Sequence, residues 1–140
     1  MGWNERRRAL ARRYSESLIE TPLIVPNLSD KSRVSAFHLY VVQCRDWEER
    51  DQLAAELKTG GIETGMHYPI PLHLQPGLSF LGYTKGRFPI AEKAAETMLS
   101  LPLFPEMTDL EQDRVLERIL AFFNAPFQTG AARTAAAQIN

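Results

Sequence analysis

The segment that most constrains this chain is GIETGMHYPIPLHLQP, residues 61–76, which holds three of the nine prolines and two of the three histidines. Each proline fixes its own φ angle and removes an N–H donor, so the segment cannot form the interior of a helix or of a central strand. It is predicted to be a stiff loop. Histidine and tyrosine side chains carry proton-transfer and hydrogen-bonding groups, so this loop is suited to presenting them to a binding partner.

Composition limits the function classes. A chain of 140 residues that is 44% apolar suits one soluble globular domain, and its net charge of -1 gives no general attraction to nucleic acid or anionic membranes. No apolar run reaches membrane-spanning length, and the N-terminus lacks a secretory signal. The single cysteine, Cys44, excludes an internal disulfide and lies in an apolar pattern typical of a buried thiol. We therefore expect a cytoplasmic protein without nucleic-acid or membrane partners.

Hydrophobic spacing predicts an alternation of helices and strands. Helices are expected over 3–20, 46–59 and 89–99, and a last helix is expected to begin at Thr108 with Glu111 completing a capping box. The first helix begins without an evident cap, which suggests a piece of something longer.

Strands are expected over 36–44, 62–64 and 101–104, and residues 125–140 are expected to form a flexible tail. The fold class that follows is α/β (α+β), with a short mixed or antiparallel sheet and helices packed mainly on one face.

Several roles are open for the polar aromatic residues. His67 and His73 lack the further ligand spacing of a metal site, and no nucleophile motif surrounds Ser79 or Cys44. His38 falls in a predicted strand, which favours a hydrogen-bonded core or interface histidine. For His67, Tyr68 and His73, contact with a substrate and a purely structural role in holding a rigid loop are equally compatible with the residues.

Five segments together resemble a known family. They are NERRRALARRYSESL, SAFHLYVVQC, GIETGMHYPIPLHLQP, FLGY at 80–83 and FPIAEKAAETMLSLPLFP at 88–105. In this order they are similar to the C-terminal region of the pyridoxal-phosphate-dependent sugar aminotransferases of the DegT/DnrJ/StrS group. The resemblance extends from residue 4 to residue 123.

The resemblance implies a fold and an activity. Residues 1–124 would be the small C-terminal domain of a fold-type I aminotransferase, with 1–20 belonging to the connecting helix. Such enzymes use pyridoxal phosphate, held as a Schiff base on a lysine, to transfer an amino group, typically from glutamate, to a nucleotide-linked keto sugar. By the same resemblance His67 and Tyr68 approach cofactor and substrate, while His73 holds the loop or contacts substrate. No catalytic residue is assigned.

The lysines set a limit on this expectation. The four lysines are Lys31, Lys58, Lys85 and Lys93, and none lies in the family's cofactor-lysine context. The large cofactor-binding domain is therefore expected to be absent, and the chain alone to be inactive and to bind no pyridoxal phosphate. The alternative is a stand-alone interaction or regulatory module derived from the family. In either case we expect self-association through the sheet or the first helix, because surfaces that met other domains would be exposed.

Overall fold

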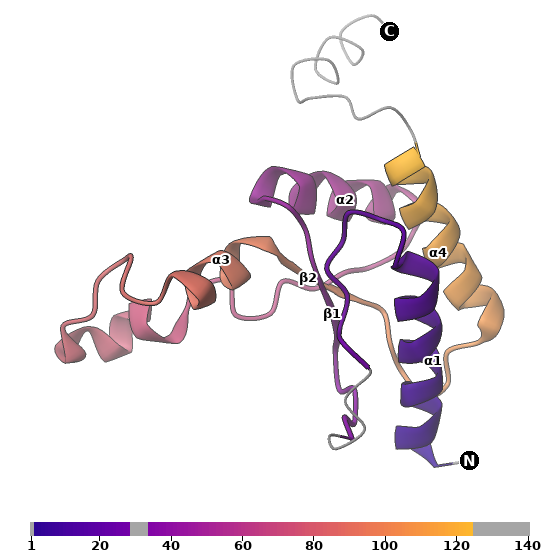
Figure 1. The fold of residues 1–140 in the computed structure, drawn as a ribbon, viewed down its shortest axis with the longest axis horizontal. Coiled ribbons are helices and arrows are strands. Elements are labelled where there is room, and N and C mark those ends of the chain that lie inside the picture. Colours follow the sequence, from indigo (N-terminus) through magenta and orange to yellow (C-terminus); the bar gives the residue numbers. More distant parts are fainter. Residues whose placement is uncertain (1, 29–33, 125–140) are drawn as a thin grey trace, which may run out of the picture.

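The computed structural model describes residues 2–28 and 34–124, so the predicted tail at 125–140 lies outside the described residues. Figure 1 shows the elements, which are α1 (Trp3–Leu18), β1 (Tyr40–Gln43), α2 (Trp47–Thr59), the 3₁₀ helices η1 (Leu72–Leu74) and η2 (Pro76–Leu81), α3 (Pro89–Thr97), β2 (Met98–Leu101) and α4 (Asp109–Asn124). Within the described ranges, none of the helices combines the length and apolar character needed to cross a bilayer.

The sheet is antiparallel and small. β1 pairs with β2 so that Tyr40 lies opposite Leu101 and Val42 lies opposite Leu99. A single antiparallel bridge from Ile24 to Gln43 extends the sheet beyond β1, and another from Gly65 to Ser100 extends it beyond β2. Both edges of the two-stranded sheet are therefore partly paired, which satisfies backbone groups that would otherwise be free.

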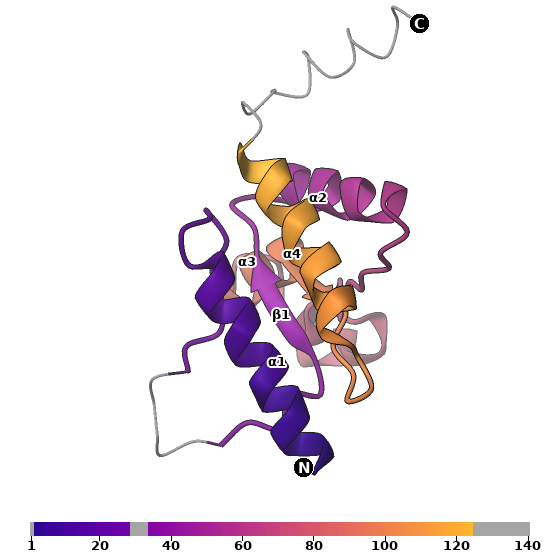
Figure 2. The same cartoon turned by 90° about the vertical axis from the view of Figure 1, so that its right-hand side faces the viewer.

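Two helices cover one face of this sheet. Figure 2 shows α1 and α4 in front of β1, while Figure 1 shows α3 and the 3₁₀ helices extending away on the opposite side. Side chains two residues apart in a strand point to the same face, and Tyr40 and Val42 of β1 are both fully buried toward the helices. The expected sheet with helices mainly on one face is confirmed, and its strands are antiparallel.

The core joins the helices to the sheet. The predicted stripe of α1, Leu10, Tyr14 and Leu18, is completely buried, as are Leu53 and Leu57 of α2. The apolar face of α4 contributes the buried residues Val115, Leu116, Ile119 and Phe122. Full burial of a large apolar side chain contributes about 1.5–3 kcal/mol, so this interface supplies the main driving force for folding.

The predicted caps of α2 and α4 are present, and the start of α1 has no side-chain cap. The Asp46 side chain accepts from the Glu49 N–H at 2.8 Å, and Thr108 Oγ1 accepts from the Glu111 N–H at 3.2 Å. At the start of α1 Gly2 supplies no side-chain cap, as expected, although the Glu5 carboxylate accepts from the Gly2 N–H at 2.9 Å. A glutamate at the third helical position can satisfy this group without a serine or aspartate before the helix.

The first strand is shorter than the predicted 36–44. It begins only at Tyr40, because Phe37 has a φ of 46° and so turns the chain out of the extended conformation. The Ser35 hydroxyl accepts from the Phe37 N–H at 3.1 Å and stabilises this turn. The placement of His38 inside a strand was therefore wrong, and the residue is exposed before β1.

The other two predicted strands are displaced. Residues 62–64 form no strand, and pairing begins only at the Gly65 bridge. The strand expected at 101–104 lies at Met98–Leu101, and α3 ends at Thr97 instead of at residue 99. Pairing with β1 decides this boundary, since the Cys44 N–H donates to the Thr97 carbonyl at 2.9 Å and draws the following residues into the sheet.

Candidate functional site

The proline-rich loop begins at the outer edge of β2. The Gly65 N–H donates to the Ser100 carbonyl at 3.0 Å, and the Ser100 N–H donates to the Gly65 carbonyl at 2.8 Å. This pair of bonds is the hydrogen-bonded unit of an antiparallel ladder. The residues that follow Gly65 therefore leave the sheet from a fixed point.

His67 folds back over that point. Its Nδ1 lies 2.8 Å from Oγ of Ser100, and either atom can be the donor, depending on the tautomer. A Cβ on Gly65 would lie 2.7 Å from Cε1 of the His67 ring, closer than real Cβ contacts come. Glycine at position 65 thus leaves room for the imidazole, while the residue as a whole remains exposed.

Tyr68 has an unusual backbone. Its φ is 59°, and 82% of its surface is exposed. A bulky residue at positive φ is an outlier, and such positions cost about 1–3 kcal/mol and cluster at functional sites. Tyr68 also makes no hydrogen bond within the described part of the chain, so no hydrogen bond of its own offsets this cost. The observation marks Tyr68 as a candidate for ligand contact.

His73 occupies a different environment. Its side chain is only 8% exposed, and its Nε2 lies 2.9 Å from Oε1 of Glu92. The ring also packs edge-on against Phe88, with centroids 4.8 Å apart. His73 therefore holds η1 against the start of α3, whereas His67 contacts β2. The structure does not unite the two histidines in one pair.

Glu92 organises the end of the loop. Its carboxylate accepts from the Gly86 N–H at 2.8 and 2.9 Å and from the Phe88 N–H at 3.2 Å, in addition to its contact with His73. The Gly86 N–H, followed by the Phe88 N–H and His73, lowers the pKa of this carboxyl group below its ordinary value of 4.5. One ionised side chain thus joins three separate segments.

No further reactive group stands out near the loop. Within the described ranges, no cluster of three His, Cys, Asp or Glu side chains could hold a metal ion. Cys44 is buried, and burial raises the pKa of its thiol to about 12, so the nucleophilic thiolate is suppressed.

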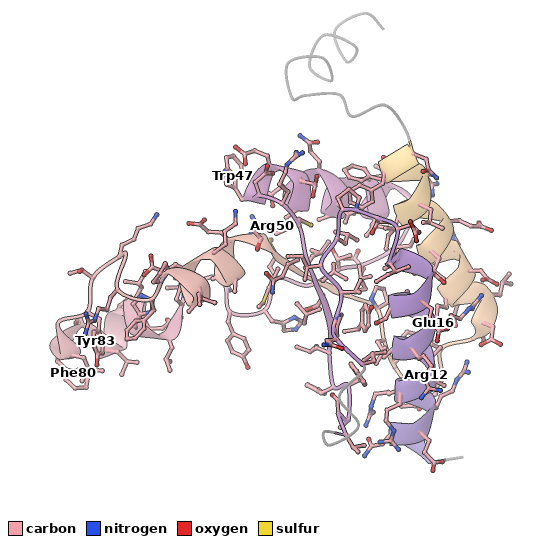
Figure 3. All side chains as sticks on the ribbon, in the orientation of Figure 1. Arg12, Glu16, Trp47, Arg50, Phe80 and Tyr83 are labelled. Carbon is pink, nitrogen blue, oxygen red and sulfur yellow. The ribbon has the colours of Figure 1, made fainter. Side chains whose placement is uncertain are left out.

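A separate hollow on α1 is lined by Arg12, Glu16, Ile19 and Val25 among others, and Figure 3 shows Arg12 and Glu16 far from Phe80 and Tyr83.

Sequence reasoning identified the loop but missed the residues that hold it. Gly65, Ser100 and Glu92 received no role, although each contacts a predicted site residue. For Glu92 a signal existed, since an acidic residue in the first turn after Pro89 is suited to accepting free N–H groups. The pairing of Ser100 with His67 depends on the sheet register, which no local pattern provides.

The sequence of this chain matches a known protein family. The model of the DegT/DnrJ/EryC1/StrS aminotransferase family matches residues 1–120. The chain belongs to the DegT/DnrJ/EryC1/StrS aminotransferase family. The predicted resemblance is thereby confirmed.

Several curated relatives agree with this family membership. A Geobacillus stearothermophilus "pleiotropic regulatory protein" is 43% identical over 86% of this chain and 32% of its own length. The "erythromycin biosynthesis sensory transduction protein EryC1" of Saccharopolyspora erythraea is 39% identical over 85% of this chain and 32% of its own length. The dTDP-3-amino-3,4,6-trideoxy-alpha-D-glucose transaminase of Streptomyces venezuelae is 35% identical over 84% and 30%. This chain therefore spans about a third of the length of these relatives.

Solved structures confirm the fold. The crystal structure of S. venezuelae DesV, in complex with a ketimine intermediate, superposes with a TM-score of 0.80 at 32% identity, over 89% of this chain and 33% of that one. A family aminotransferase from Brucella abortus gives a TM-score of 0.76 at 32% identity, over 87% and 31%. These neighbours are fold-type I aminotransferases, so the predicted fold class is confirmed.

Proposed function

We propose that this chain is the small C-terminal domain of a pyridoxal-phosphate-dependent aminotransferase acting on nucleotide-linked keto sugars, with glutamate as amino donor. The carrying observation is the family match across residues 1–120, together with a relative that is a dTDP-sugar transaminase. In this proposal residues 1–124 form the small domain, residues 1–20 belong to the connecting helix, and the cofactor-binding domain lies outside the chain.

Within this domain we assign ligand contact to His67 and Tyr68. Tyr68 combines an exposed side chain with a strained backbone, and His67 is held beside it on the edge of β2. The earlier alternative for His73, substrate contact, has less support because its side chain is buried against Glu92 and Phe88. His73 is better explained as the residue that holds the loop in place.

The described lysines do not fit the role of cofactor anchor. A Schiff-base lysine must lose its proton, which a buried or apolar environment favours. Lys58, Lys85 and Lys93 are all exposed, and Lys93 Nζ donates to the Arg45 carbonyl at 2.9 Å. Pyridoxal phosphate would supply the electron sink of transamination in the intact enzyme, and we assign its anchoring to the part outside this chain.

A domain exchange tests the proposal. Residues 3–124 would replace the matching third of the S. venezuelae transaminase, and transamination of its dTDP-sugar would be measured. We expect an active chimera whose kcat/KM falls when Tyr68→Ala is introduced. The matched control is Tyr83→Ala, another exposed tyrosine of the same loop region. A chimera that folds and binds cofactor but shows no transamination would contradict the proposal.

The isolated chain offers a complementary measurement. When pyridoxal phosphate is added to the 140-residue protein, we expect no stable Schiff-base absorbance band, because none of the described lysines has the required environment. A stoichiometric band that survives gel filtration would show that this chain carries its own cofactor site.

A second candidate is a non-catalytic interaction or regulatory module. It is favoured by the names of two relatives, a "pleiotropic regulatory protein" and a "sensory transduction protein". This candidate predicts that the chain binds a full-length family enzyme without contributing to its turnover. An inactive chimera combined with tight, saturable binding to the intact S. venezuelae transaminase would favour it over the first proposal.

We also propose that an exposed apolar surface mediates self-association. Nine large apolar side chains between residues 66 and 90 are exposed, namely Met66, Tyr68, Ile70, Leu72, Phe80, Leu81, Tyr83, Phe88 and Ile90. Residues 66–90 extend away from the core as an arm (Figure 1), and Figure 3 shows Phe80 and Tyr83 at the end of this arm, far from α1. Exposed apolar patches of this kind mark interaction surfaces. The expected association through the sheet or the first helix is thus extended to this arm.

A further inference from the structure

The hydroxyl of Ser100 lies where a strand residue would ordinarily be apolar. Ser100 is only 6% exposed, and its neighbours Leu99 and Leu101 are part of the core. A buried hydroxyl without a hydrogen bond is costly. Within the described part of the chain, the partner of this hydroxyl is Nδ1 of His67 at 2.8 Å. Ser100 and His67 therefore satisfy each other across the edge of β2.

Gly65 provides the space for this contact. Its backbone is fixed by two hydrogen bonds to Ser100, and its missing Cβ leaves room for Cε1 of the imidazole. Position 65 favours glycine because of the space that the His67 ring occupies: a Cβ there would lie 2.7 Å from Cε1 and 3.1 Å from Nδ1 of the ring. The ring of His67 is thus held between the backbone of one residue and the hydroxyl of another.

From this geometry we infer that Ser100 and Gly65 are positioning residues, which fix the His67 ring so that Nε2 is presented to a polar oxygen of the sugar nucleotide. The inference rests on the proposed function. Nδ1 is engaged by Ser100, and Nε2 makes no hydrogen bond to any residue the structure describes. A serine hydroxyl can donate to or accept from Nδ1, so it fixes the ring without fixing the tautomer. Nε2 can accordingly donate to a phosphate oxygen or accept from a sugar hydroxyl.

NMR spectroscopy of the full 140-residue chain, without ligand, tests the positioning. In the wild type we expect an NOE between Hε1 of His67 and Hα of Gly65, together with a ring-current shift of that Hα. Ser100→Ala should lose both signals and Ser100→Thr should restore them, while Ser79→Ala, at an exposed serine, should leave them unchanged. Gly65→Ala should displace the ring. An NOE that persists in Ser100→Ala would overturn the inference.

Addition of dTDP distinguishes this inference from the proposed function. We expect dTDP to shift the His67 Hε1 resonance of the wild type, and we expect the apparent Kd to rise in Ser100→Ala and to recover in Ser100→Thr. If the ligand-free NOE behaves as expected but dTDP shifts no His67 resonance, the positioning is supported and the ligand contact is contradicted. If dTDP binds Ser100→Ala and the wild type equally, the role of Ser100 in presenting Nε2 is overturned.

Discussion

Nε2 of His73 lies 2.9 Å from Oε1 of Glu92, and this contact joins the 3₁₀ helix η1 to α3 across 19 residues of sequence. The same carboxylate accepts the Gly86 and Phe88 N–H groups. A single side chain therefore determines how the arm returns to the sheet. Removing the Glu92 carboxylate is expected to loosen the arm more than the core, because its hydrogen bonds are to residues of the arm and not to the core residues of α1, α2 and α4.

Glu92→Gln tests this dependence. The substitution removes the negative charge and turns an NH₂ group toward N–H donors, so the amides of Gly86 and Phe88 should exchange with deuterium faster than in the wild type. The matched control is Glu96→Gln on the same helix, where the carboxylate is half-exposed and lies 3.7 Å from Lys85. Equal exchange in both variants would show that Glu92 does not hold the arm.

The lowered pKa of Glu92 predicts a pH dependence. A carboxyl group with a folded-state pKa below its unfolded value contributes stability above the unfolded value and loses it as the pH falls through the folded pKa. Protection of the Gly86 amide should therefore decline as the pH falls below 4.5, the ordinary value for this group. Hydrogen exchange measured from pH 6 downward checks this. In Glu92→Gln the same amide should show no such step, and a retained step would assign it to another group.

Tyr40→Phe tests a buried hydroxyl pair of the core. Oγ of Ser15 lies 2.8 Å from the Tyr40 hydroxyl, and burial raises the pKa of Tyr40 to about 12. Removing one partner leaves the other without a hydrogen bond, so the free energy of unfolding should fall by about 1–2 kcal/mol in urea denaturation. Tyr83→Phe, at an exposed tyrosine, is the control. If Ser15→Ala costs as much in the Tyr40→Phe background as alone, the two hydroxyls are not coupled.

Tyr68→Asn separates stability from function. Asparagine tolerates positive φ better than tyrosine, so the free energy of unfolding should rise by about 1 kcal/mol. In the proposed chimera the same change should lower kcat/KM because the aromatic contact is lost. Tyr83→Asn, at a position without positive φ, should not stabilise the chain. A Tyr68→Asn variant that is less stable than the wild type would indicate that the backbone at this position is not strained.

Self-association through the arm is tested by Phe80→Asp. A charge at this position should reduce the weight-average mass found by light scattering at high protein concentration. Leu110→Asp on α4 is a closely matched control, since Leu110 is 79% exposed and Phe80 is 78% exposed. If both variants and the wild type remain monomeric over the same concentration range, the arm does not mediate association.

The sequence predicted the helices well because their signals are local. The apolar spacing of Leu10, Tyr14 and Leu18 and the cap at Asp46 depend only on nearby residues, and the structure agrees at both places. Strand boundaries depended on pairing. β2 lies three residues earlier than predicted because β1 draws Met98 into the sheet. The left-handed turn at Phe37 was equally invisible to periodicity.

The site was predicted in part for the same reason. Prolines and aromatic residues identified the loop, and its residues His67 and Tyr68 remain predictions for ligand contact. Their support comes from residues distant in sequence, such as Ser100, which is 33 positions from His67. Such contacts follow from tertiary structure, and no spacing rule in the loop itself could reveal them.

The anchorage of His73 on Glu92 also bears on how this family can diversify. The bridge between Gly65 and Ser100 closes the chain at the base of the arm, and the contact between His73 and Glu92 closes it a second time farther out. Residues 74–91 therefore form a shorter loop of their own. Entropy makes longer loops only slightly less favourable, by about 0.6 kcal/mol for each doubling of length. Insertions or deletions between residues 74 and 85 should therefore leave the geometry at residues 65–68 unchanged. Evolution could remodel the tip of the arm for new partners while residues 65–68, where we propose ligand contact, keep their geometry.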